Sequence, residues 1–109
     1  MKVAIIGSRG AEVYDFEKYL PVECKEIVSG GAKGIDSCAA EYARRKGLVL
    51  VEFFPEYDLY GRGAPIVRNK KIVDYSDMVI AFWDGKSRGT KSVIDYCGKI
   101  GKECRIVYV

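Results

Sequence analysis

The sequence of 109 residues contains no histidine. Histidine is the usual acid or base at neutral pH, so its absence excludes Ser-His and Cys-His nucleophile pairs and the mixed Cys/His zinc sites. The four cysteines (Cys24, Cys38, Cys97 and Cys104) include no CxxC pair. We therefore expect reduced thiols, with Cys38 and Cys97 packed on apolar helix faces, and neither a metal site nor a cofactor.

Long apolar runs are missing as well. No stretch approaches the roughly 20 apolar residues that a membrane helix needs, and the N-terminal run is shorter than a signal-peptide core. We therefore expect no membrane association and a cytoplasmic location. Charge is not extreme, because 18 Lys and Arg against 15 Asp and Glu give a formal net charge of +3. So small an excess does not identify a nucleic-acid-binding protein.

The chain does have short β-branched runs that alternate with amphipathic segments of helix length, a pattern typical of βαβ units. Its length fits one domain over residues 1–109, without a linker or repeat. Most runs are nearly continuous in Val, Ile, Leu or Phe, which indicates strands covered on both faces. We predict a doubly wound, three-layer α/β domain with a five-stranded, mainly parallel sheet. The predicted strands are Lys2–Gly7, Lys25–Ser29, Leu48–Phe53, Met78–Phe82 and Arg105–Tyr108.

Helix signals of differing strength fill the segments between the strands. Apolar residues at helical spacing before Gly47 predict the strongest helix, and Pro65 is a favoured first residue for another. Pro21 ends a short helix near the N-terminus. The predicted helices are Tyr14–Leu20, Gly34–Lys46, Pro65–Tyr75 and Thr90–Ile100.

Three strand-to-helix turns concentrate glycine, hydroxyl and cationic residues. In a parallel sheet these turns share the carboxyl edge, where ligands bind at the switch point. Glycine lets the backbone approach an anion, and the following helix offers N–H donors and a positive dipole end. One such turn is often only a tight connection, but three on one edge predict a phosphate site. The turns are Gly7-Ser8-Arg9-Gly10, Ser29-Gly30-Gly31-Ala32-Lys33-Gly34 and Asp84-Gly85-Lys86-Ser87-Arg88-Gly89-Thr90.

The known nucleotide-binding fingerprints are missing from these turns. There is no G-x-x-x-x-G-K-[ST], which disfavours ATP hydrolysis of the P-loop type, and no G-x-G-x-x-G. The second predicted strand ends in Val28-Ser29, where a dinucleotide-binding unit places its ribose-binding acid. The sequence therefore disfavours a conventional NAD enzyme.

Carboxylates are the groups left for catalysis. Asp36 and Asp84 fall near the glycine-rich edge and are candidates for stabilising an oxocarbenium ion or orienting water in N-glycosidic cleavage. Asp in a first helical turn and Thr at a helix start are common capping residues, so capping is the favoured interpretation of Asp36 and Thr90. Asn69 interrupts a predicted apolar helix face, so with Arg68 it either reaches the ligand or bridges nearby loops.

The longest irregular stretch expected is Phe54–Ala64. It is either a lid over the glycine-rich edge or a surface loop whose tyrosines pack on its own base. Because aromatic rings stack on bases, we expect Tyr57, Tyr60 or Trp83 to cover the base of a bound nucleotide.

Taken together, these motifs resemble the SLOG superfamily, and more narrowly its small YspA-like members. The resemblance covers nearly the whole chain and implies a Rossmann-like sheet, often in a dimer. Relatives include the LOG phosphoribohydrolases, the DprA/Smf proteins that bind single-stranded DNA, and proposed nucleotide sensors. The residues that carry it are Gly7-Ser8-Arg9, Ser29-Gly30-Gly31-Ala32-Lys33-Gly34-Ile35-Asp36, Arg68-Asn69, Phe82-Trp83-Asp84-Gly85 and Ser87-Arg88-Gly89-Thr90.

The chain departs from the LOG enzymes at the catalytic position, because Val93 stands where the motif P-G-G-x-G-T-x-x-E has its catalytic glutamate. We therefore expect a domain that binds or senses a phosphorylated nucleotide or nucleotide derivative without cleaving it. A LOG-like hydrolase and a DprA-like binder of single-stranded nucleic acid are the alternatives. The expected ligand-binding residues are Gly7, Ser8, Arg9, Ser29, Gly30, Gly31, Ala32, Lys33, Gly34, Asp36, Arg68, Asn69, Asp84, Gly85, Ser87, Arg88, Gly89 and Thr90.

Overall fold

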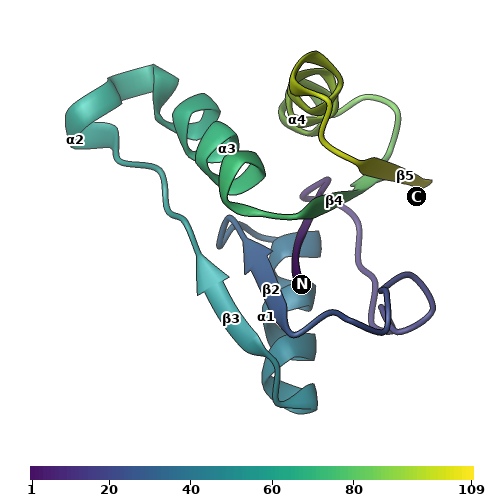
Figure 1. Cartoon of the computed structure of the whole chain (residues 1–109). Helices are drawn as coiled ribbons and strands as arrows, with labels where there is room; N and C mark the ends of the chain where they lie inside the picture. The colour runs from purple at the N-terminus through teal and green to yellow at the C-terminus, as the bar shows by residue number, and fades with distance from the viewer.

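A computed structural model describes all 109 residues and contains one five-stranded sheet (Figure 1). Every neighbouring pair of strands is parallel, and the order is β3-β2-β1-β4-β5. This order places a switch point between β1 and β4, the Rossmann-like arrangement. The predicted fold class is therefore confirmed, and each predicted strand is present to within one residue at its ends. The strands are β1 (Lys2–Gly7), β2 (Glu26–Ser29), β3 (Val49–Glu52), β4 (Met78–Trp83) and β5 (Cys104–Tyr108).

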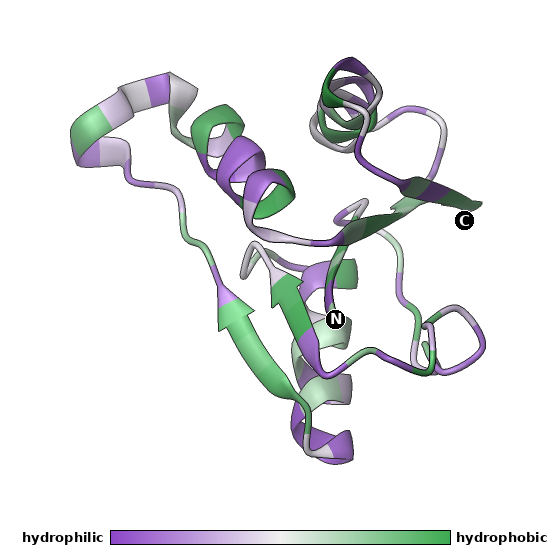
Figure 2. Cartoon of the chain, in the orientation of Figure 1, coloured by the Kyte–Doolittle hydropathy of each residue, from purple (hydrophilic) through white to green (hydrophobic).

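Helices cover both faces of the sheet. Side chains of β1 alternate between two cores, so Val3 and Ile5 pack with α1 (Ile35–Lys46) on one face. Ala4 and Ile6 pack with α3 (Ala64–Tyr75) and α4 (Arg88–Ile100) on the other. Figure 2 shows the apolar strands between these mixed helices. The three predicted layers follow from this alternation, and no helix is long and apolar enough to cross a membrane.

The predicted helix at Tyr14–Leu20 is wrong, because this segment forms only a bend and a turn. Asp15 Oδ1 accepts a hydrogen bond from the Glu17 amide at 3.0 Å, a local bond that competes with helix formation. Phe16 is completely buried, and its ring meets Tyr42 edge-on with centroids 5.5 Å apart. The crossover from β1 to β2 is thus a coil whose one large side chain fills the core.

The stretch Phe54–Ala64 also differs from its expected irregular form. It contains the short helix α2 (Tyr57–Tyr60) and the 3-10 turn η1 (Gly61–Gly63), which lead into α3. Figure 1 shows α2 standing away from the sheet. Tyr57 and Tyr60 are exposed, so they do not pack on the base of a loop.

Candidate functional site

A cavity of about 430 Å³ lies at the carboxyl edge of the sheet, where β1 and β4 diverge. Its walls come from the turns that follow β1, β2 and β4 and from one face of α3. Ligand sites of α/β proteins occur at this switch point. The residues that line it are Ile6, Gly7, Ser8, Arg9, Gly10, Gly30, Ala32, Asp36, Pro65, Arg68, Asn69, Ile72, Asp84, Ser87, Gly89, Thr90 and Val93.

The cavity thus brings together most of the ligand-binding residues predicted from the sequence. The predicted residues that do not line it are Ser29, Gly31, Lys33, Gly34, Gly85 and Arg88. Sequence reasoning did not select Ile6, Gly10, Pro65 or Ile72, whose apolar or flexible character carries no ligand-binding signal. Val93, noted only as a missing glutamate, is 2% exposed and gives this wall an apolar surface.

Ser8 ties the first turn to the turn after β4. Its amide donates to the Phe82 carbonyl at 3.0 Å, and its Oγ accepts from the Asp84 amide at 3.2 Å. The Ser8 side chain is buried and also helps to lower the Asp84 pKa. Gly7 permits this approach, because a Cβ there would lie 2.7 Å from the Phe82 oxygen.

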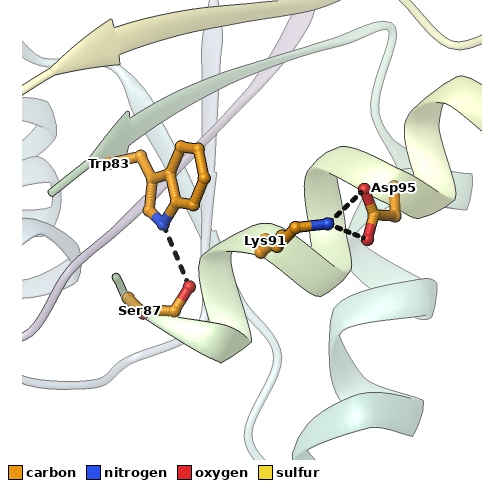
Figure 3. Close-up of polar contacts among 4 residues, drawn as sticks. All are labelled: Trp83, Ser87, Lys91 and Asp95. Atoms are coloured by element: carbon orange, nitrogen blue, oxygen red, sulfur yellow. Dashed lines mark hydrogen bonds and ion pairs between the residues drawn. The ribbon is translucent and has the colours of Figure 1, made fainter. Parts of the chain in front are cut away.

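The turn after β4 is built around Asp84 and the start of α4. Asp84 Oδ1 accepts from the amides of Lys86 and Ser87, both at 2.8 Å. These bonds lower the Asp84 pKa, so the carboxylate stays ionised. Ser87 caps α4 by accepting from the Thr90 amide, and its carbonyl receives the indole N–H of Trp83 at 3.0 Å (Figure 3).

Two backbone N–H donors at the start of α4 have no hydrogen-bond partner. Helix geometry gives the Arg88 and Gly89 amides no partner within the helix, and neither bonds elsewhere in the chain. Gly89 lines the cavity, and added bulk there would meet no atom within 4 Å. Free N–H groups with a positive helix dipole form an anion-binding arrangement.

Asp36 supplies a carboxylate on the opposite wall. Its residue is 6% exposed, and Oδ2 accepts from the Ala32 amide at 3.2 Å. Burial raises the Asp36 pKa to about 6, against the lowering effects of the Ala32 bond and of the Arg68 and Arg9 charges.

Arg68 reaches from α3 across the edge of the sheet. Nη1 donates to the Gly30 carbonyl at 2.6 Å and to the Phe53 carbonyl at 3.4 Å. Nε donates to Asn69 Oδ1 at 2.7 Å, so Asn69 orients the guanidinium. Burial lowers the Arg68 pKa, yet a guanidinium keeps its charge. Nη2 makes no hydrogen bond within the chain, and Arg68 lines the cavity.

Two predicted glycines outside the cavity have conformational roles. Gly31 has φ +70°, and a Cβ there would lie 2.3 Å from the Phe54 ring. Gly34 has φ +75°, and its Cβ would lie 2.3 Å from the Arg9 carbonyl oxygen. Other residues are strongly disfavoured in both conformations, so these glycines hold the second turn in shape.

None of the three aromatic residues expected to cover a base lines the cavity. Trp83 packs against Tyr108, with ring centroids 5.9 Å apart. Tyr60 lines a second, adjoining hollow of about 340 Å³ that shares Arg68 with the cavity. Of the residues that line this hollow, the sequence predicted a ligand contact only for Tyr60 and Arg68. Its lining is Glu52, Phe53, Phe54, Glu56, Tyr60, Ala64, Val67, Arg68 and Lys71.

Known proteins give no direct guide to these two hollows. No protein-family model matches the chain, and neither the curated proteins nor the solved structures include a match.

Proposed function

We propose that this domain binds or senses a phosphorylated nucleotide or nucleotide derivative in the cavity at the carboxyl edge of the sheet. The observation that carries the proposal is the start of α4, where the Arg88 and Gly89 amides lack partners and Gly89 lines the cavity. A phosphate at this point accepts both N–H groups and meets the positive end of a 13-residue helix.

Cationic side chains support the phosphate at the same edge. Arg9 and Arg68 line the cavity, while Lys33 and Arg88 are exposed in adjacent turns. Guanidinium groups match phosphate oxygens in geometry and charge. Ser8 adds a hydroxyl group to the lining of the cavity.

The second hollow offers a place for the base. It begins at Arg68, where the cavity ends, and its lining includes the exposed rings of Phe54 and Tyr60. Flat heterocycles stack on aromatic rings, whereas the cavity itself has no aromatic lining residue. The resemblance to the SLOG superfamily, with its nucleotide-sensing members, points to the same class of ligand.

Native mass spectrometry of the purified protein and calorimetric titration test this proposal together. We expect a co-purifying nucleotide, or binding of ribonucleoside 5′-monophosphates that is much tighter than binding of the corresponding nucleosides. Equal affinity for nucleosides and nucleotides would remove phosphate recognition and overturn the assignment.

Hydrolysis of the bound nucleotide is the alternative that one observation favours. Asp36 has its pKa raised to about 6 and lines the cavity, which suits a group that exchanges a proton near neutral pH. Against this, Val93 presents no acid where the LOG enzymes have theirs. Incubation with nucleoside monophosphates, followed by chromatography for free base, decides between binding and cleavage.

A further inference from the structure

Asp36 is a buried carboxylate that keeps an acceptor free in the cavity. Its residue is 6% exposed, Oδ2 takes the Ala32 amide, and Oδ1 accepts no hydrogen bond from the chain. Oδ1 is not sealed in the interior either, because no fully buried side-chain oxygen lacks a partner. Asp84, the other carboxylate of the cavity, is exposed and already holds two backbone amides.

The free acceptor of such a carboxylate can receive a hydrogen bond only from a donor outside the chain. An ionised carboxylate has about four acceptor positions, and burying a charge with few hydrogen bonds is unfavourable. A ligand that donates to Oδ1 offsets part of this penalty. The position therefore favours ligands with O–H or N–H groups on the side away from their phosphate.

The charges around Asp36 indicate which donor fits. Arg9 and Arg68 act on its carboxylate from two different elements, and Glu52 adds a negative charge at longer range. An ammonium group or a metal ion would meet the same two guanidinium groups and be repelled. A neutral hydroxyl group has no such conflict.

We propose that Asp36 determines specificity for ribose, with Oδ1 accepting hydrogen bonds from the sugar hydroxyls of a ligand whose phosphate lies at the start of α4. This inference rests on the proposed function, because it places the sugar of the same nucleotide. The ligand class is then ribonucleotides, and deoxyribonucleotides are rejected.

Calorimetric titration of AMP and GMP against their 2′-deoxy counterparts tests the inference. For the wild-type protein at pH 7.5 we expect the deoxy ligands to bind about tenfold more weakly or worse, the usual effect of a lost hydrogen bond to a charged group. Asp36→Asn keeps an oxygen for the Ala32 amide and should bring the ribo-to-deoxy affinity ratio close to one. Asp58→Asn, an exposed carboxylate in α2, is the matched control and should keep the wild-type ratio.

The ratio is the proper readout, because Asp36→Asn also removes a negative charge and should raise affinity for every phosphate. The wild-type ratio should fall as the pH is lowered through about 6, where Asp36 gains its proton. Protonation of the phosphate changes the affinities of ribo and deoxy ligands by the same factor. The charges of Arg9, Arg68 and Glu52 also act equally on both ligands, so these effects cancel in the affinity ratio.

Equal wild-type affinity for ribo and deoxy ligands would overturn the inference and leave the proposed function intact. Failure of both AMP and GMP, and of their deoxy forms, to bind would overturn the proposed function and this inference with it. If Asp36→Asn does not fold, the wild-type ratio and its pH profile decide, and a ratio that does not change with pH contradicts the role of Asp36.

Discussion

Arg68 Nη1 and Asp36 Oδ2 converge on one point of the backbone, lying 2.8 and 2.9 Å from the place where a Cβ atom at residue 30 would be. A guanidinium from α3 and a carboxylate from α1 can approach the second turn this closely only because residue 30 is glycine. The two charged groups do not form an ion pair within 4.0 Å. Each is instead held by backbone groups of the turn between them.

Gly30→Ala should therefore destabilise the protein by about 1–3 kcal/mol, because the added methyl group displaces the buried bond from Arg68 to the Gly30 carbonyl. Chemical denaturation measures the change in free energy of unfolding. Gly10→Ala is the matched control, since a Cβ there meets nothing within 4 Å and the change should be within about 0.5 kcal/mol. Equal effects of both substitutions would contradict the role given to Gly30.

Asp36→Asn should stabilise the folded protein near neutral pH and have little effect in acid. Burial raises the Asp36 pKa from 3.8 to about 6, so the folded state holds this proton more tightly than the unfolded state. The wild-type protein then loses stability as the pH rises from about 4 through about 6, and the variant does not. The difference in unfolding free energy should approach about 3 kcal/mol above pH 6, since one pKa unit corresponds to about 1.4 kcal/mol.

Urea titrations of both proteins between pH 4 and pH 8 measure this difference. Other carboxylates titrate in both proteins and cancel on subtraction. A constant difference across that range would show that Asp36 ionises normally in the folded protein.

Gly89→Pro should weaken nucleotide binding about tenfold with little effect on folding. Proline removes one of the two free amides at the start of α4, and a helix tolerates proline in its first turn. The chain already has this arrangement in α3, where Pro65 is the second helical residue, just as Gly89 is in α4.

Gly89→Ala keeps the amide and is the control for the change in side chain. Affinity for AMP is measured by calorimetry, with circular dichroism to establish that α4 is retained. If Gly89→Ala weakens binding as much as Gly89→Pro, the amide is not the group that holds the phosphate.

Tyr60→Ala should lower affinity for a nucleoside monophosphate about tenfold and leave affinity for ribose 5-phosphate unchanged. Stacking on an aromatic ring contributes about 1–3 kcal/mol per base, and ribose 5-phosphate has no base to stack. Tyr14→Ala removes another exposed tyrosine, far along the chain from the second hollow, and should change neither affinity. Equal loss for both ligands would place Tyr60 outside the base site.

The sheet was predictable because its signals are local. Short apolar, β-branched runs predicted every strand, and the parallel direction of the strands followed from their alternation with helices. The helix predicted at Tyr14–Leu20 is absent, and the segment instead contributes Phe16 to the core from a coil. Nothing in its local spacing indicates that burial.

The sequence predicted where the candidate site lies, but only partly which residues line the cavity and which shape the backbone around it. Glycine in a strand-to-helix turn has the same signature whether it borders a ligand or relieves a clash, so Gly30 and Gly34 could not be distinguished. They differ in their neighbours, which come from α3 and α1 for Gly30 and from the first turn for Gly34. The second hollow depends on the path of the chain from β3 through α2 to α3. How these elements pack against one another has no local signal in the sequence.

The cavity walls have a mechanical consequence. The turns after β1 and β2 line one side and the turn after β4 lines the other, while at the sheet the two sides adjoin through the pairing of β1 with β4. A ligand that contacts both sides would bridge the line along which β1 and β4 pair. Under the proposed function, loss of the ligand would remove the contacts that it makes across this line.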